Sequence, residues 1–272
     1  MKELLCRAEE RGCAIGAFSV GNMEMVMGAI RAAEETDTPI ILQIAEKRLK
    51  ASPLPLMAPM MVSAAKNARV PVAVHLDHGL TEDCVARALE YGFTSVMLDG
   101  SLLPFEKNIA VTKRVVALAA AYGATVEAEL GVVGGNEGDT AEHVISCTDP
   151  EKAAVFCAET GVDALAVAIG NAHGNYSVLP RLRFDVLAAI DQAVDTPLVL
   201  HGGTGITDEM FRRAIDLGVR KINIATASFD ALANKVRSMC ADAVPDYFAL
   251  SAGAAQAVYE NVQRYIRVFS GS

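Results

Sequence analysis

Eight short, almost continuously apolar runs recur along the chain, and a longer segment of helical periodicity follows each of them. Such runs are typical of strands buried on both faces, as in parallel sheets covered by helices. The predicted strands are 13–20, 39–45, 70–77, 95–99, 125–130, 164–170, 197–202 and 221–226. The predicted helices after them are 24–36, 56–68, 81–91, 105–122, 150–160, 184–193, 208–217 and 227–241.

Eight strand–helix units predict an α/β fold, a single TIM (β/α)8 barrel with an extra C-terminal helix. A doubly wound open sheet is the alternative, because the same alternation would also produce it. The number eight and the lack of a G-x-G-x-x-G pattern after the first strand favour the barrel. No shift in composition and no linker indicates a second domain.

The charge balance excludes several classes of partner. Lys and Arg total 24 against 33 Asp and Glu, which gives a formal net charge of −9. Without a basic surface, we expect neither a nucleic-acid partner nor an anionic membrane partner. No apolar stretch approaches the roughly 20 residues of a membrane span, and the N-terminal segment lacks the apolar core of a signal peptide.

Six cysteines are scattered along the chain without a C-x-x-C pair. In a chain of this length they are expected to be reduced and mostly buried, which predicts a cytoplasmic protein. They are Cys6, Cys13, Cys84, Cys147, Cys157 and Cys240.

The histidines gather at one end of the predicted barrel. Four of the five in the chain, His75, His78, His173 and His201, lie at the carboxyl ends of strands, where barrel enzymes carry their catalytic groups. A lone histidine is usually an ordinary packed residue, but four at one rim predict a metal site. His78, His173 and His201 supply three ligands and leave a position for substrate. His75, three residues before His78, is expected to project to the opposite face of its strand and to be structural.

Two further features predict an anion site and a proton-transfer group. Gly202-Gly203-Thr204-Gly205 follows the seventh strand, and Asn223-Ile224-Ala225-Thr226 ends the eighth. Loops at these two positions bind phosphate in many barrels. Asp77 adjoins His78 and is either a general acid/base or a carboxylate that orients its neighbours. The glycine-rich stretch 131–147 after the fifth strand is a candidate active-site loop.

A metal, a phosphate site and carboxylates, without a nucleotide motif, predict carbon–carbon cleavage or enolisation of a phosphorylated ketose. An enediolate can be stabilised by a lysine Schiff base or by a Lewis-acid metal. The sixth strand has no lysine, and Lys221 is expected at the start of the eighth strand, the wrong end of the barrel, so the metal is favoured. The alternatives are a metal-dependent barrel hydrolase, which commonly has an H-x-H pair that the first strand here lacks, and a non-catalytic relative.

Six segments together resemble the class II, metal-dependent ketose-bisphosphate aldolases, which cleave fructose or tagatose 1,6-bisphosphate. The likeness extends from about residue 14 to residue 231. The segments are VHLDHG (74–79), SVMLDGS (95–101), VEAELGVVGG (126–135), VDALAVAIGNAHGNY (162–176), LVLHGGTG (198–205) and KINIAT (221–226).

The resemblance implies one aldolase domain over residues 1–272, a catalytic Zn²⁺ held by the three histidines, and a zinc-stabilised enediolate. Asp77 matches the residue that handles the proton on the hydroxyl of the nascent aldehyde. Glu137 matches the glutamate that removes a proton from dihydroxyacetone phosphate. Asp99 and Glu129 match carboxylates near the metal that can hold a second divalent ion or a displaced one.

The resemblance also implies a dihydroxyacetone-phosphate site, a monovalent cation that assists phosphate binding, and a homodimer or homotetramer. The apolar character of residues 252–269 predicts that this segment packs on a neighbouring copy. The partner is then a small phosphorylated sugar. The residues that match the phosphate site are Gly174, Gly202, Gly203, Thr204, Asn223, Ile224, Ala225 and Thr226.

Several positions depart from the family pattern in ways that concern the substrate. Ser19 stands where the family usually has asparagine, and Ala45 where it has serine. Bisphosphate-cleaving relatives carry an arginine near the last helix that meets the distal phosphate, but residues 245–253 contain none. Because an arginine fork is well matched to a phosphate dianion, a ketose 1-phosphate without a distal phosphate is the alternative substrate.

Overall fold

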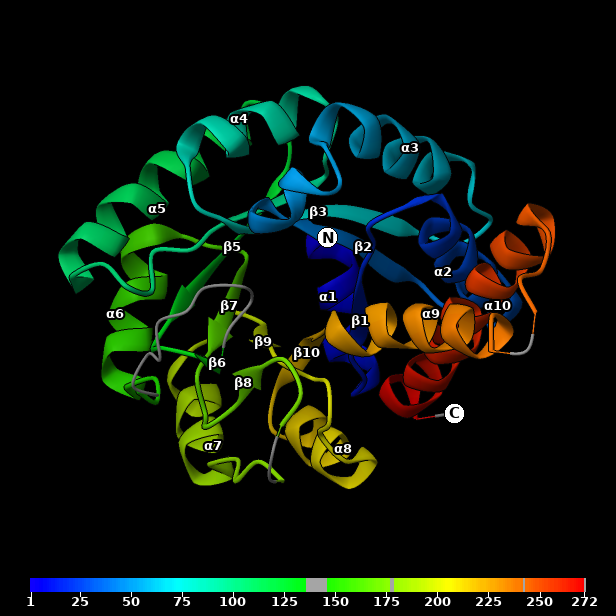
Figure 1. Ribbon diagram of the computed structural model, residues 1–272. Coiled ribbons are helices and arrows are strands. Elements are labelled where there is room, and N and C mark those ends of the chain that lie inside the picture. Colours follow the sequence, from blue (N-terminus) through cyan, green and yellow to red (C-terminus); the bar gives the residue numbers. More distant parts are fainter. Residues whose placement is uncertain (136–145, 177–178, 242, 272) are drawn as a thin grey trace.

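Eight parallel strands form a closed barrel in the computed structural model, which describes residues 1–135, 146–176, 179–241 and 243–271 (Figure 1). Their order around the barrel is β1-β10-β9-β7-β5-β4-β3-β2. The predicted TIM barrel is therefore confirmed, and the open sheet is wrong. The strands are β1 (Ile15–Ser19), β2 (Ile40–Ala45), β3 (Val72–Gly79), β4 (Ser95–Leu98), β5 (Thr125–Leu130), β7 (Ala164–Val167), β9 (Leu198–Leu200) and β10 (Val219–Ile224).

Helices surround this barrel and pack their apolar faces on its outer surface (Figure 1). Side-chain caps begin several of them: the Asn22 and Thr81 side chains accept hydrogen bonds from the backbone N–H groups of Met25 and Cys84. The helices are α2 (Met23–Glu35), the 3₁₀ turn η1 (Glu46–Lys50), α3 (Leu54–Asn67), α4 (Glu82–Glu90), α5 (Phe105–Ala120), α6 (Pro150–Thr160), α7 (Phe184–Ala193), α8 (Asp208–Asp216), α9 (Thr226–Met239) and α10 (Tyr247–Ser270).

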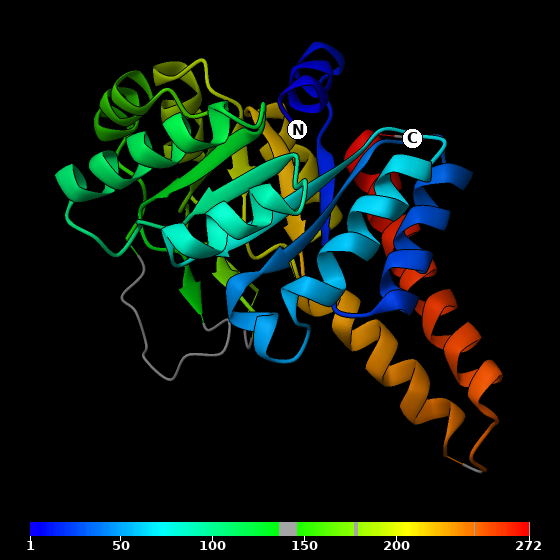
Figure 2. The ribbon, with the colours of Figure 1, turned by 90° about the horizontal axis from the view of Figure 1, so that it is seen from above.

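An N-terminal helix, α1 (Lys2–Arg11), covers the amino-terminal end of the barrel (Figure 2). Its buried face packs against inward-facing residues of the strands and forms an apolar plug. The members of the plug are Leu4, Leu5, Ala8, Ile15, Ala17, Ile41, Ala73, Ala164, Ala166 and Val199. Ligands are therefore expected at the opposite, carboxyl-terminal end.

The extra C-terminal helix is confirmed as α10, which packs along α2 and forms a hairpin with α9 that extends from the barrel (Figure 2). Gly28 permits the close approach of α2, because a Cβ there would lie 2.5 Å from the carbonyl oxygen of Ala255. Val244 and Phe248, at the turn of the hairpin, are exposed. No helix in the described part of the chain has the length and apolar character needed to cross a membrane.

Three sequence expectations need correction. Residues 164–170 do not form one strand: β7 ends at Val167, and a short strand β8 (Ala172–His173) pairs with β6 (Gly134–Gly135) in a separate two-stranded sheet. The eighth barrel strand begins at Val219, so Lys221 lies inside the strand and not at its start. The cysteines are free, as expected, but of the six only Cys84 is buried.

Candidate metal and anion site

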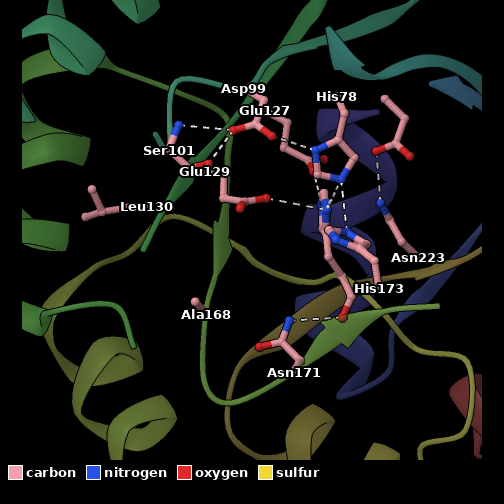
Figure 3. A network of polar contacts seen from close by, with 12 residues as sticks. His78, Asp99, Ser101, Glu127, Glu129, Leu130, Ala168, Asn171, His173 and Asn223 are labelled. Carbon is pink, nitrogen blue, oxygen red and sulfur yellow. Dashed lines mark hydrogen bonds and ion pairs between the residues drawn. The ribbon is translucent and has the colours of Figure 1, made fainter. Parts of the chain in front are cut away.

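Three imidazole rings meet at the carboxyl-terminal end of the barrel (Figure 3). His78 comes from β3, His173 from β8, and His201 directly follows β9. Nε2 of His78 lies 3.2 Å from Nε2 of His173 and 2.8 Å from Nδ1 of His201. The fold thus brings together the three residues that the sequence predicted as metal ligands.

An unusual backbone conformation turns His78 inward. Its φ of 39° is in the left-handed region, and the pairing of β3 with β4 shifts register between Leu76 and Gly79. Regular alternation would place Asp77 and His78 on opposite faces, but the shift lets both face the interior. The prediction that His75 projects away from the site is therefore wrong: its Nε2 lies 3.7 Å from the buried Glu127, inside the barrel.

Two side chains that sequence reasoning did not assign connect His173 to the His201 segment. The buried Asn171 donates from Nδ2 to the carbonyl oxygen of His201, at 3.0 Å. The Tyr176 hydroxyl accepts from the Ala172 N–H at 2.8 Å and donates to the Gly202 carbonyl at 3.0 Å. These bonds connect β8 with the end of β9, so they fix the position of His173 relative to His201.

Carboxylates hold the outer nitrogens of two of the rings. Nδ1 of His78 lies 2.8 Å from Oδ2 of Asp99, whose Oδ1 accepts hydrogen bonds from Ser101. Nε2 of His201 lies 2.9 Å from Oε1 of Glu127. This carboxylate–histidine pattern orients metal ligands in many proteins, because it leaves the inner nitrogen free to coordinate.

The electrostatics of the centre favour positive charge. Burial lowers the pKa of His78, but the carboxylates of Asp77, Asp99 and Glu129 outweigh it and hold that pKa well above the usual value. Burial lowers the pKa of His201 well below normal, so this ring is neutral. Burial, with Asp99 nearby, raises the pKa of Glu129.

A divalent cation fits this donor set. Oε2 of Glu129 is buried without a hydrogen-bond partner and lies 3.6 Å from Nδ1 of His201. Two groups of candidate ligand atoms, each within 4.8 Å of one another, share His78: one adds His173 and His201, the other Asp99 and Glu129. Imidazole and carboxylate ligands in this number are typical of zinc sites.

Asp77 lies beside the histidines and is held by two amides. Its Oδ1 accepts from Nδ2 of Asn223 and its Oδ2 from Nε2 of Gln43, each at 3.1 Å. Although Asp77 is buried, it lines a cavity that it shares with His78 and His173. A carboxylate fixed at the wall of a cavity can exchange a proton with a ligand there.

The other wall of this cavity is made by the predicted phosphate loops. The Gly203 N–H donates to the Asn223 carbonyl, and the Thr204 hydroxyl accepts from the Ala227 N–H at the start of α9. The amino end of a helix therefore faces the cavity, as in many anion sites. The cavity is lined by Gln43, Asp77, His78, His173, Gly174, Gly202, Gly203, Thr204, Asn223, Ala225 and Thr226.

Of the predicted catalytic and substrate-binding residues, two are not in this lining. Ile224 is fully buried in the hydrophobic core, where its side chain packs beneath Gly203. Glu137 lies outside the described residues. Gly135, two positions before it in the sequence, pairs with His173 in the β6–β8 sheet.

Sequence reasoning left Glu127 and Lys221 without a role in the site, yet both side chains are fully buried within the barrel. Charged residues are almost never fully buried unless they are paired. A charged residue at an inward position of an apolar strand was therefore the signal that could have identified them.

Comparison with known proteins agrees with this geometry. Residues 1–272 match the family described as class II fructose-bisphosphate aldolase. A fructose-bisphosphate aldolase of Staphylococcus aureus is 39% identical over 277 residues, covering 100% of this chain and 97% of that protein. The 6-phospho-5-dehydro-2-deoxy-D-gluconate aldolase of Halalkalibacterium halodurans is 38% identical, with coverage of 100% and 96%. The crystal structure of the YdjI aldolase from Escherichia coli K12 has a TM-score of 0.89 and 38% identity, over 98% and 96% of the two chains.

Proposed function

The chain belongs to the class II fructose-bisphosphate aldolase family, and from that premise we propose that it reversibly cleaves a ketose 1-phosphate or 1,6-bisphosphate. The products are dihydroxyacetone phosphate and an aldehyde. The observation that carries this proposal is the convergence of His78, His173 and His201 beside Asp77, in a cavity whose other wall is the Gly202–Gly203 loop.

The three histidines would hold a Zn²⁺ ion, and His78 with Asp99 and Glu129 offers a second divalent position. When bound, the catalytic ion polarises the C2 carbonyl of the substrate and stabilises negative charge that develops there. The carboxylates of Asp99, which is half-buried, and Glu127, which is fully buried, keep the rings of His78 and His201 oriented during the reaction.

The residues of the chain supply binding and proton transfer. The C1 phosphate is bound between the Gly202–Gly203 loop and the amino end of α9, with a monovalent cation as a further contributor. Asp77 takes the proton from the C4 hydroxyl as the C3–C4 bond breaks. Glu137 then returns a proton to C3 of the three-carbon product.

The distal end of the substrate separates two versions of this function. The relative from Halalkalibacterium halodurans is named for a substrate with one phosphate and a carboxylate, whereas the Staphylococcus aureus relative is named for a bisphosphate. Residues 245–253 contain no arginine. This favours a ketose 1-phosphate without a distal phosphate as the second candidate.

The first experiment tests the half-reaction that both versions share. Zinc-loaded protein is mixed with dihydroxyacetone phosphate in deuterated buffer, and the loss of one C3 proton signal is followed by NMR. We expect stereospecific exchange that EDTA abolishes. A zinc-bound protein without exchange would overturn the proposal and favour another metal-dependent barrel reaction or a non-catalytic relative. A subsequent screen of fructose 1,6-bisphosphate, tagatose 1,6-bisphosphate and ketose 1-phosphates then identifies the substrate and its aldehyde product.

We propose that the protein acts in the cytoplasm as a homodimer or homotetramer. The exposed Val244, Tyr247 and Phe248 at the α9–α10 turn support an assembly in which this hairpin meets another copy. Sedimentation equilibrium that shows only a monomer would contradict the assembly.

A further inference from the structure

Lys221 is a fully buried lysine beneath the site, and the proposed reaction gives it no part. It lies on β10, and its Nζ forms an ion pair with Oε2 of Glu127 at 2.9 Å. Nζ also donates to Oε1 of Glu127 at 3.3 Å and to Oδ1 of Asn223 at 2.6 Å. Its ammonium group therefore binds two side chains, and each of them contacts a different part of the site.

One branch leads to the metal ligands. Oε1 of Glu127, which accepts from Lys221, also lies 2.9 Å from Nε2 of His201. Because a carboxylate only accepts hydrogen bonds, this contact requires a proton on Nε2 of His201. Nδ1, the nitrogen that faces His78, then presents a lone pair to a metal ion.

The other branch leads to the proton-transfer group. Asn223 accepts from Lys221 through Oδ1 and donates through Nδ2 to Oδ1 of Asp77, at 3.1 Å. An ammonium only donates and a carboxylate only accepts, so the amide between them has one orientation that satisfies both. Lys221 thereby prevents the amide from presenting its oxygen to Asp77.

We propose that Lys221 is a positioning residue that fixes two groups of the site at once, His201 through Glu127 and Asp77 through Asn223. The first branch concerns metal binding alone, and the second rests on the proposed aldolase function. Lys221 is not a Schiff-base lysine here, since its Nζ is held by Glu127 and Asn223 inside the barrel.

A purely structural ion pair would not need these connections. The neighbouring residue on β10, Arg220, makes such a pair: its guanidinium bonds both carboxylate oxygens of Glu9 in α1, at 2.7 and 2.9 Å. Arg220 is buried like Lys221, but none of its hydrogen bonds among the described residues reaches the site. It therefore offers a matched control on the same strand.

The test compares Lys221→Met with Arg220→Met and with the double variant Lys221→Met/Glu127→Gln. The single change at Lys221 leaves the Glu127 carboxylate buried without a counter-charge, which can prevent folding. The double variant removes both charges and keeps an oxygen that can accept from His201. Near-ultraviolet circular dichroism and thermal melting select the variants that fold.

Metal affinity tests the first branch without any need for activity. Zn²⁺ is titrated in competition with a chromophoric chelator. We expect Lys221→Met to bind Zn²⁺ more weakly than the wild type, by up to about 10-fold, because Glu127 loses the ammonium group that orients it toward His201, and this loss outweighs the removal of a nearby positive charge. The double variant should lose less, and Arg220→Met should be unchanged. Wild-type affinity in a folded Lys221→Met protein would overturn this branch.

The second branch is tested by separating two reactions at saturating zinc. Exchange of the C3 proton of dihydroxyacetone phosphate does not involve Asp77, whereas cleavage of the ketose does. We expect both Lys221 variants to keep exchange within about 3-fold of the wild type and to lose about 10- to 100-fold in kcat for cleavage, with little change in KM. Equal losses in exchange and cleavage, or none in either, would overturn the branch. If the wild type itself lacks both reactions, the proposed function fails, and zinc affinity alone decides the role of Lys221.

Discussion

The same strands fill the two ends of the barrel interior with opposite kinds of side chain. Towards the amino ends, the inward residues are apolar and pack on α1. Further along four of these strands they become polar, although they remain buried: Ala17 of β1 is followed by Ser19, Ile41 of β2 by Gln43, Ala73 of β3 by His75 and Asp77, and Val199 of β9 by His201. We call the first set the apolar layer, and the second set, together with the buried Glu127 and Glu129 of β5, the polar layer.

The difference shows how stability and chemistry are divided along the strands. Hydrophobic burial in the apolar layer stabilises the fold and makes no demand on hydrogen bonding. In the polar layer every buried polar atom needs a hydrogen-bond partner, and some of them lack one. Of the five buried side-chain atoms without a hydrogen-bond partner in the described residues, four belong to this layer: Gln43 Oε1, His75 Nε2, Glu129 Oε2 and Glu127 Oε2, the last of which instead forms an ion pair with Lys221 at 2.9 Å. Such groups are typical of functional sites.

The largest expected effect is the removal of the metal from the polar layer. Treatment with EDTA, or the change His173→Ala, should reduce cleavage by about 10³-fold or more, because several kcal/mol of charge stabilisation are lost. Cleavage of a ketose 1-phosphate is measured before and after dialysis. Added Zn²⁺ should restore the wild type but not the variant, and full activity of metal-free protein would contradict the assignment of the site.

A smaller loss is expected from Asp77→Asn, which keeps the shape of the side chain but removes the proton acceptor. Cleavage should fall about 10²- to 10⁴-fold. Exchange of the C3 proton should remain close to that of the wild type, because it needs the metal centre and a different base. NMR exchange and a coupled cleavage assay on the same protein measure the two rates, and their ratio is compared with that of the wild type. A parallel loss of both reactions would show that Asp77 acts on the metal centre as a whole.

The apolar layer should show the reverse behaviour. Leu5→Ala in α1 removes a fully buried side chain from the plug and should lower the free energy of unfolding by about 2–5 kcal/mol. Zinc affinity and kcat should stay within about 2-fold of the wild type, since the change lies at the other end of the barrel. Urea denaturation and the cleavage assay measure the two quantities.

The matched control for Leu5→Ala is Leu56→Ala in α3, whose side chain is 72% exposed. It should change the free energy of unfolding by no more than about 0.5 kcal/mol. If Leu5→Ala abolished zinc binding in a protein that is still folded, the two layers would not be independent.

The sequence allowed the apolar layer and much of the polar layer to be predicted, for different reasons. Near-continuous apolar runs identified all eight barrel strands, because strands buried on both faces have few polar residues. The gathering of His78, His173 and His201 followed from the rule that parallel strands of a barrel end at one rim. Both inferences depend only on local pattern and on a general property of the fold.

Long-range and irregular features could not be predicted in this way. The left-handed backbone of His78 is rare for a residue other than glycine, so alternation along the strand gave the wrong face for His75. The β6–β8 sheet has only two residues in each strand, too few for any periodicity. The contact of Lys221 with Glu127 joins residues 94 positions apart, and no spacing in the sequence predicts it.

The smallest expected effect concerns His75, which lies in the polar layer but does not face the metal. Its Nδ1 lies 2.7 Å from the Ser95 hydroxyl, and burial, with Lys221 nearby, lowers its pKa well below the ordinary value. The folded protein therefore keeps His75 neutral, whereas the unfolded chain takes up a proton below roughly pH 6.5. Stability should thus decrease as the pH falls through that value, by up to about 1.4 kcal/mol per pH unit from this residue.

The variant His75→Gln isolates this contribution, because glutamine can still bond the Ser95 hydroxyl but does not titrate. Metal-free wild type and variant are denatured with urea at pH 7.5 and pH 5.5. We expect the wild type to lose about 1 kcal/mol more than the variant between the two conditions. Since His201 titrates equally in both proteins, it cancels in the difference. Identical losses would mean that His75 titrates alike in the folded and unfolded protein, and a smaller loss in the wild type would mean that the folded protein keeps it protonated; either result would contradict a lowered pKa.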